Sequence, residues 1–484
     1  MKKILFALIG GAVLSLVGCA MNGGVASGNN LPYVTDAKII VSPLDWGPAV
    51  DKILLEMSGE VSADYIEKAG LPKVVTNGSE REVIGVSLAS NDGEEDKKAK
   101  SSAYVIVSLK NPFVNYLGFP FHYDTKKLQS EWASSFPVKV QFEKFGGIET
   151  DCINKRICKA TDVFSEQKEI SGTYENPLTK ASENITLRYK AYEPDSLKND
   201  GKKNPLVIWL HGQGEGGKDV DVAILGNKVS ALTTKKIQSY FTTEGGESGA
   251  YVLVPQCETY WMDGGDGTNS CGDVVSRYTK ALYDLICAYL KENSDVDEKR
   301  IYLGGCSNGG YMTVNMLVEY PDFFAAAYPN CEAYAFNEYE RDANGKYVFE
   351  NKGLKLTGKR FMTEEKIEKI KNIPIWFVHS ADDGVVVPEG HSIPTYRELV
   401  KAGAKNVHYS YFENVINHEY SGVENEPKTY WGHWVWVYLF NDEVSAVQDV
   451  NNFVATNAGG GTLKAHDDKG EYTSIFAWLN AQSK

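Results

Sequence analysis

The sequence lacks the patterns that mark several classes of protein. Its 484 residues contain no His-Glu-x-x-His motif, no Cys/His spacing of a zinc site and no internal repeat. Acidic residues outnumber basic residues, and the formal net charge is −14. Such a balance argues against nucleic acid as a partner and against electrostatic binding to anionic lipid. We therefore expect no metal, no cofactor and no nucleic-acid partner.

Long apolar runs are also scarce, apart from one at the start of the chain. Residues 4–17 follow Met1-Lys-Lys and form a run of ~14 residues, shorter than the ~18–20 that span a bilayer. This pattern predicts a signal peptide over residues 1–18. Leu16-Val-Gly-Cys19 resembles a bacterial lipobox, which implies lipidation of Cys19, a flexible tether over residues 19–34 and an exported, membrane-anchored lipoprotein on the cell surface or the periplasmic side. An ordinary signal peptide with an incidental cysteine is the alternative.

The eight cysteines fit an exported protein. If Cys19 carries lipid, the number left is odd, so at least one cysteine is unpaired. Cys152 with Cys158 and Cys257 with Cys271 are plausible local pairs, although sequence does not fix the connectivity.

The remaining length suits two domains. Short β-type runs separated by polar turns predict an all-β sandwich over residues 35–150; the clearest are 37–42, 83–89, 103–110 and 138–144. Near-continuous apolar runs at 206–211, 251–255, 301–305 and 375–379 are typical of buried parallel strands, and they alternate with helical patterns such as 274–290. We expect a doubly wound α/β domain over residues 151–484, with a linker at about 151–180.

The third of these α/β-type runs ends in Gly305-Cys306-Ser307-Asn308-Gly309, and a helical pattern follows. Strand, Gly-x-Ser-x-Gly and helix together form a nucleophile elbow, in which the glycines allow a sharp turn that exposes the serine hydroxyl. Ser307 is the candidate nucleophile.

His211-Gly212-Gln213-Gly214-Glu215-Gly216-Gly217 follows the first α/β-type run. Gly212, Gly214 and Gly217 satisfy Gly-x-Gly-x-x-Gly. However, no obvious helix opens after them and no acidic residue ends a second strand at the usual distance, which disfavours a dinucleotide site. A glycine-rich loop here suits an oxyanion hole. We predict the backbone N–H groups of Gln213 and Asn308 as its donors, with Gly212 as the alternative to Gln213.

A catalytic triad built on Ser307 also needs an acidic residue and then a histidine further along the chain. Asp383 and Asp382 both follow the run at 375–379, and Asp383 has the better spacing before its Val-Val pair. His433, at an aromatic loop-to-helix junction, is preferred as the base, and His418 is the alternative. The other histidines are expected to be structural, exposed or without a partner pattern: His379, His408, His466, His122 and His391.

The sequences around His211, Ser307, Asp383 and His433 resemble those of secreted bacterial esterases related to polyhydroxybutyrate depolymerases and feruloyl esterases, whose catalytic domain is prolyl-oligopeptidase-like. The resemblance implies an α/β-hydrolase fold. Two further segments, residues 45–50 and 111–113, resemble the immunoglobulin-like domain that precedes some of these esterases.

These features predict a serine carboxylesterase acting on a short acyl, acetylated-sugar or feruloyl ester, a small-molecule or carbohydrate substrate. The alternatives are a serine peptidase of short peptides and an inactive surface binding protein. Trp261 and Trp431 are weaker candidates, either for an aromatic substrate cleft or for ordinary packing. Cys306 is either a packed thiol or half of a disulfide, with Cys331 or Cys287 as the partner.

Overall fold

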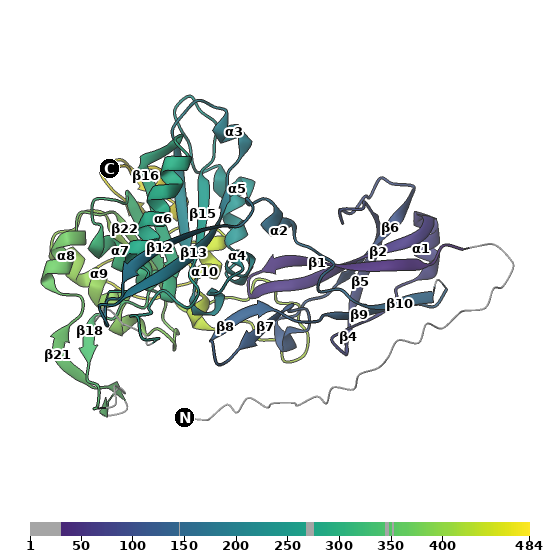
Figure 1. The fold of residues 1–484 in the computed structure, drawn as a ribbon, viewed down its shortest axis with the longest axis horizontal. Coiled ribbons are helices and arrows are strands. Elements are labelled where there is room, and N and C mark those ends of the chain that lie inside the picture. Colours follow the sequence, from purple (N-terminus) through teal and green to yellow (C-terminus); the bar gives the residue numbers. More distant parts are fainter. Residues whose placement is uncertain (1–30, 145, 268–274, 344–347, 351–352) are drawn as a thin grey trace.

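The computed structural model describes residues 31–144, 146–267, 275–343, 348–350 and 353–484. A β-rich N-terminal part, purple to blue in Figure 1, lies beside a larger α/β part. The signal peptide predicted at 1–18, most of the predicted tether, and Cys19 and Cys271 lie outside the described residues. Within these ranges, no helix combines the length and the apolar character needed to cross a bilayer.

Two sheets share one apolar core in the N-terminal part. Side chains alternate between core and solvent, most regularly along Pro137–Phe142. The larger sheet has the order β11 (Arg156–Ile157), β1 (Val34–Leu44), β2 (Gly47–Ser62), β6 (Ser101–Leu109), β5 (Val83–Ala89); the smaller has the order β10 (Gly146–Asp151), β9 (Pro137–Phe142), β3 (Lys73–Thr76), β4 (Ser79–Arg81). The predicted β-rich region is thus present. Helix α1 (Ala63–Ala69) and a separate hairpin, β7 (Phe121–Asp124) with β8 (Gln129–Trp132), complete this part.

An eight-stranded sheet forms the centre of the α/β part. Its order is β12 (Lys168–Glu175), β13 (Ser182–Tyr192), β15 (Tyr251–Gln256), β14 (Asn204–Leu210), β16 (Val296–Cys306), β17 (Ala326–Asn330), β22 (Ile375–Ser380), β23 (Val407–Phe412). Strands β15 to β23 in this order are parallel, whereas β12 and β13 add an antiparallel edge. Buried parallel strands must be apolar on both faces, which is why their sequences read as continuous apolar runs.

Helices cover both faces of this sheet. One face packs against α6 (Thr279–Glu292), α7 (Asn308–Glu319), α8 (Glu364–Ile370) and α9 (Ser392–Lys401). The other packs against α4 (Val220–Gly226), α5 (Lys235–Gln238), α10 (Trp436–Phe440) and α11 (Ile475–Asn480). The predicted α/β-hydrolase fold is confirmed. The short elements are α2 (Lys159–Asp162), α3 (Asp195–Lys198), β18 (Asn337–Tyr339), β19 (Phe349–Glu350), β20 (Gly353–Leu354), β21 (Leu356–Arg360), β24 (Ala465–His466) and β25 (Glu471–Tyr472).

Two expectations differ from the structure. Residues 151–180 carry strands as well as connecting segments, because β11 joins the larger N-terminal sheet and β12 the edge of the main sheet. The plausible Cys152–Cys158 pair is not formed, since both are buried free thiols and the Cys152 thiol donates to the Ala37 carbonyl at 3.4 Å. Cys257 is also a free thiol.

A polar and aromatic joint connects the two parts. Asp45, 3% exposed, accepts hydrogen bonds from Lys228 Nζ (2.6 Å) and from the Asn441 amide (3.0 Å). Beside it, the ring of Phe113 lies 5.0 Å from that of Tyr430 and 5.6 Å from that of Trp434. The N-terminal part therefore packs directly against the segment that leads to His433.

Candidate active site

Ser307 occupies a strained turn between β16 and α7. Its φ of 56° and ψ of −113° lie outside the regions that non-glycine residues favour, at a cost of about 1–3 kcal/mol. The flanking glycines are required here, since a Cβ on Gly309 would lie 2.0 Å from the Leu210 carbonyl oxygen and one on Gly305 2.6 Å from it. The sequence thus holds the serine at the N-terminus of a helix, as a nucleophile elbow demands.

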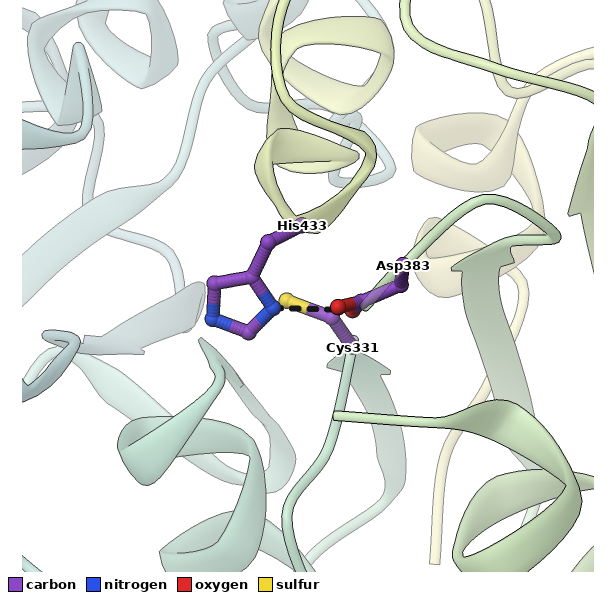
Figure 2. Close-up of side chains that lie close together, drawn as sticks. All are labelled: Cys331, Asp383 and His433. Atoms are coloured by element: carbon purple, nitrogen blue, oxygen red, sulfur yellow. Dashed lines mark hydrogen bonds and ion pairs between the residues drawn. The ribbon is translucent and has the colours of Figure 1, made fainter. Parts of the chain in front are cut away.

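Asp383 and His433 form a direct pair across the site (Figure 2). His433, in the 3₁₀ turn Gly432–Trp434, places Nδ1 2.8 Å from Asp383 Oδ2. The other oxygen of Asp383 accepts hydrogen bonds from the N–H groups of Val385 (2.8 Å) and Val386 (2.9 Å). Burial alone would raise the pKa of Asp383, but hydrogen bonds from His379 and His433 outweigh it and hold that pKa well below its ordinary value. An ionised carboxylate therefore fixes the His433 ring.

His379, which we expected to be structural, forms a second hydrogen bond to the Asp383 carboxylate. Its Nε2 lies 2.9 Å from the Val386 carbonyl and 3.2 Å from Asp383 Oδ2, and both of these atoms only accept hydrogen bonds. A neutral His379 must therefore carry its proton on Nε2 and accept at Nδ1 from the hydroxyl of Ser392 (2.6 Å). Ser392 in turn contacts the Tyr409 hydroxyl at 2.7 Å. No local sequence pattern marks this chain of hydrogen bonds, because its partners come from α9 and β23.

Cys331 lies between Ser307 and the pair formed by Asp383 and His433. Its sulfur and the ligand atoms of Asp383 and His433 all lie within 4.8 Å of one another (Figure 2). The N–H of Ser307 faces the Cys331 thiol, and that N–H also donates to the Asn330 carbonyl at 3.0 Å. Ser307 and His433 thus flank one thiol. Among the described residues, the Ser307 hydroxyl has no hydrogen-bond partner, and such contacts often tighten only when substrate binds.

The loop after β14 places Gln213 at the start of a 3₁₀ turn, Gln213–Glu215. His211 supports the loop from below: Nδ1 lies 2.6 Å from the Gly212 carbonyl, and Nε2 accepts the N–H of Cys257 at 3.3 Å. Burial lowers the pKa of His211 to about 4, so the ring is neutral. Within the described part of the chain, the N–H groups of Gln213 and Asn308 donate to no other residue. Both therefore remain available to an oxyanion.

Of the two alternatives left open for Trp261, the structure supports ordinary packing. Trp261 is fully buried, and its ring lies 5.1 Å from that of His211 and 5.9 Å from that of Tyr278. Its backbone N–H donates to Asn308 Oδ1, so it positions the Asn308 side chain. Trp431, 61% exposed and two residues before His433, is on the surface as a cleft residue must be.

Glu215 adds a titratable group beneath the oxyanion loop. A Cβ on Gly212 would lie 2.8 Å from Glu215 Oε2, and one on Gly226 would lie 2.6 Å from Glu215 Cγ. Burial raises the pKa of this carboxyl to about 7. Its ionisation would bring negative charge close to the position where an oxyanion forms.

The alternative candidates lie elsewhere. Asp382 is exposed and accepts a hydrogen bond from the Ser380 hydroxyl at 2.6 Å. His418 lies in the joint between the two parts, 3.2 Å from Asp45 and 3.1 Å from Glu443. Cys306, Cys331 and Cys287 are all free thiols, so Cys306 is a packed thiol and not half of a disulfide.

The Cys331, Asp383 and His433 cluster is the one group among the described residues whose atoms are spaced closely enough to hold a metal ion. However, the Nδ1 of His433 is committed to Asp383, and burial holds the pKa of the Cys331 thiol well above its usual range. The arrangement favours proton transfer over metal binding.

Comparisons with known proteins agree with this geometry. The sequence profile of the Prolyl oligopeptidase family matches residues 281–439, which include Ser307, Asp383 and His433. Poly(3-hydroxyalkanoate) depolymerase C from Paucimonas lemoignei is 34% identical over 87 residues, which are 16% of this chain and 20% of the depolymerase. The chain thus aligns with only a fifth of that protein's length. The crystal structure of a thermostable esterase aligns with 93% of this chain and with its own full length, at 20% identity and a TM-score of 0.61. By fold, this protein is an α/β-hydrolase.

Proposed function

We propose that the protein is a serine carboxylesterase with Ser307 as nucleophile, His433 as base and Asp383 as the orienting acid. The observation that carries this proposal is the 2.8 Å contact between His433 and Asp383 beside the strained Ser307 turn. The esterase and depolymerase names of the similar proteins favour an ester over a peptide bond.

In this mechanism, His433 Nε2 takes the proton of Ser307 Oγ as that oxygen attacks the ester carbonyl. The N–H groups of Gln213 and Asn308 stabilise the negative oxygen of the tetrahedral intermediate. When this intermediate collapses, the bond to the alcohol breaks and His433 gives its proton to the leaving oxygen. Water, deprotonated by His433, then hydrolyses the acyl-enzyme and releases the acid.

Ser307→Ala tests the nucleophile. Hydrolysis of a p-nitrophenyl ester should fall by about 10³-fold or more, and labelling by a fluorophosphonate should disappear. Asp383→Asn and Asp382→Asn form a matched pair in which only the former should be severely impaired. Full activity of the Ser307 variant would refute the assignment, and wild-type protein that fails to label would indicate an inactive binding protein. Peptide amides assayed beside the esters separate esterase from peptidase.

We also propose that the protein is exported and anchored through lipid on Cys19, in keeping with the lipobox-like sequence before it. Cys19→Ser should shift the protein out of the membrane fraction, or leave it unprocessed, while esterase activity survives. Mass spectrometry that finds no lipid on wild-type Cys19 would overturn this proposal.

A further inference from the structure

A cleft of about 780 Å³ lies between the two parts of the molecule. One wall is the β7–β8 hairpin, with Lys127 and residues 129–132; the other is made by residues 216–219, Val222, Gln256 and 258–260. Ligand sites of small molecules have volumes of about 300–1,000 Å³, so the cleft is large enough for an extended group.

The cleft adjoins the proposed oxyanion loop. Gln256 Nε2 donates to the Glu215 carbonyl at 2.8 Å, at the end of the turn that begins with Gln213. On the other side, Tyr260 directly precedes Trp261, whose N–H holds the Asn308 side chain. This second wall therefore continues into the turn that begins with Gln213 and into the segment that holds Asn308, which places the cleft beside the proposed oxyanion donors.

The charges in this cleft are already paired. Lys127 Nζ lies 2.7 Å from Glu131, Lys218 Nζ 3.7 Å from Glu258, and the Trp132 indole N–H donates to Asp219 at 3.0 Å. A strongly charged ligand would have to disrupt these pairs, and an apolar ligand would bury them. The lining favours a neutral ligand rich in hydrogen-bonding groups.

Gln256 supplies an unused acceptor to this ligand. The side chain is 1% exposed, and its Nε2 also donates to the Asp219 carbonyl at 2.9 Å. Its Oε1 has no partner among the described residues. A buried acceptor without a donor costs about 1–3 kcal/mol, and a ligand hydroxyl would remove that cost. Tyr260 adds an aromatic ring to the same lining.

We propose that this cleft binds the carbohydrate portion of the substrate, a neutral polyhydroxylated chain esterified at the carbonyl that Ser307 attacks. The proposal rests on the proposed esterase function and names its substrate class. The β7–β8 hairpin of the N-terminal part then determines specificity without touching the reacting atoms.

Filling the cleft tests this proposal. Ser130→Trp on β8 should lower kcat/KM on acetylated neutral oligosaccharides by about tenfold or more, and leave p-nitrophenyl acetate within about twofold of wild type. Lys218→Trp, on the opposite wall, should behave in the same way if Ser130→Trp fails to fold. His122→Trp is the matched control, because His122 is exposed on the same hairpin but lies outside the cleft lining.

A direct measurement of oligosaccharide binding provides a second test. Titration of Ser307→Ala protein with xylo-, manno- and gluco-oligosaccharides should give a heat signal that Ser130→Trp abolishes. Equal effects of Ser130→Trp on both ester types, or no effect on either, would overturn the cleft assignment. Wild-type protein that binds oligosaccharide but neither hydrolyses p-nitrophenyl acetate nor labels with a fluorophosphonate would instead refute the esterase function.

Discussion

Replacement of His379 by leucine tests whether this residue positions Asp383, the proposed catalytic acid. The ring is fully buried, and its Nε2–H is shared between the Val386 carbonyl and Asp383. A hydrogen bond to a charged group contributes about 1.5–3 kcal/mol, and a shared bond of 3.2 Å belongs at the lower end. Since 1.36 kcal/mol corresponds to a factor of ten in rate, kcat should fall about tenfold while KM changes little.

The pH profile distinguishes positioning from general damage. Asp383 without the His379 donor carries a less neutralised charge, so it should stabilise protonated His433 more strongly. The acid limb of kcat/KM should therefore move to higher pH. Two other titratable groups near His433, the Cys331 thiol and His391, are not altered by the change.

His408→Leu is the matched control. His408 is also buried, in neighbouring β23, where its ring packs 5.4 Å from Trp376 and 5.8 Å from Trp478, away from Asp383. This variant should keep the wild-type pH profile. A folded His379→Leu protein with wild-type kcat and an unmoved acid limb would refute the reasoning, and equal losses in both variants would indicate destabilisation alone.

Three further outcomes are expected. In Glu215→Gln protein, kcat/KM should fall less than in wild type as the pH rises through about 7, because the wild-type carboxyl ionises there and its negative charge opposes the oxyanion. An unchanged pH profile would contradict this. The joint should weaken in alkali, because hydrogen bonds that His418 donates to Asp45 and to Glu443 raise the pKa of His418 to about 9. The stability that this contact adds is complete below pH ~6.5 and is lost as the pH rises through about 9, and His418→Gln should remove this dependence from thermal melts. Gly309→Ala should destabilise the fold by about 3 kcal/mol or more, whereas Gly470→Ala, whose Cβ meets nothing within 4 Å, should melt like wild type.

Much of the fold could be predicted because its signals are local. The buried parallel strands are continuous apolar runs, and the expected run at residues 375–379 lies within β22. The expected helix at 274–290 begins instead at Thr279, after a turn in which both the N–H and the hydroxyl of Thr279 donate to the Ser276 carbonyl. Helix boundaries depend on such individual hydrogen bonds, which hydrophobic periodicity does not reveal.

The site was less accessible to sequence reasoning. Chain order narrowed the base to two histidines, but only the tertiary structure places His433 on Asp383 and His418 at the joint. The sequence also left open whether Trp261 lines a cleft or packs in the core, because the local pattern is the same in both cases. The role of His379 depends on partners from separate elements, and no local pattern identifies them.

The contact of Phe113 with Tyr430 and Trp434 has a consequence for any attempt to shorten this protein. The segment that ends in His433 rests on aromatic rings supplied by the N-terminal part. A fragment that contains only the α/β part would expose Tyr430 and Trp434 to water and would lose the surface that supports His433. The two parts therefore form one unit for protein engineering. A different N-terminal module would have to supply an aromatic side chain that packs on Tyr430 and Trp434 as Phe113 does.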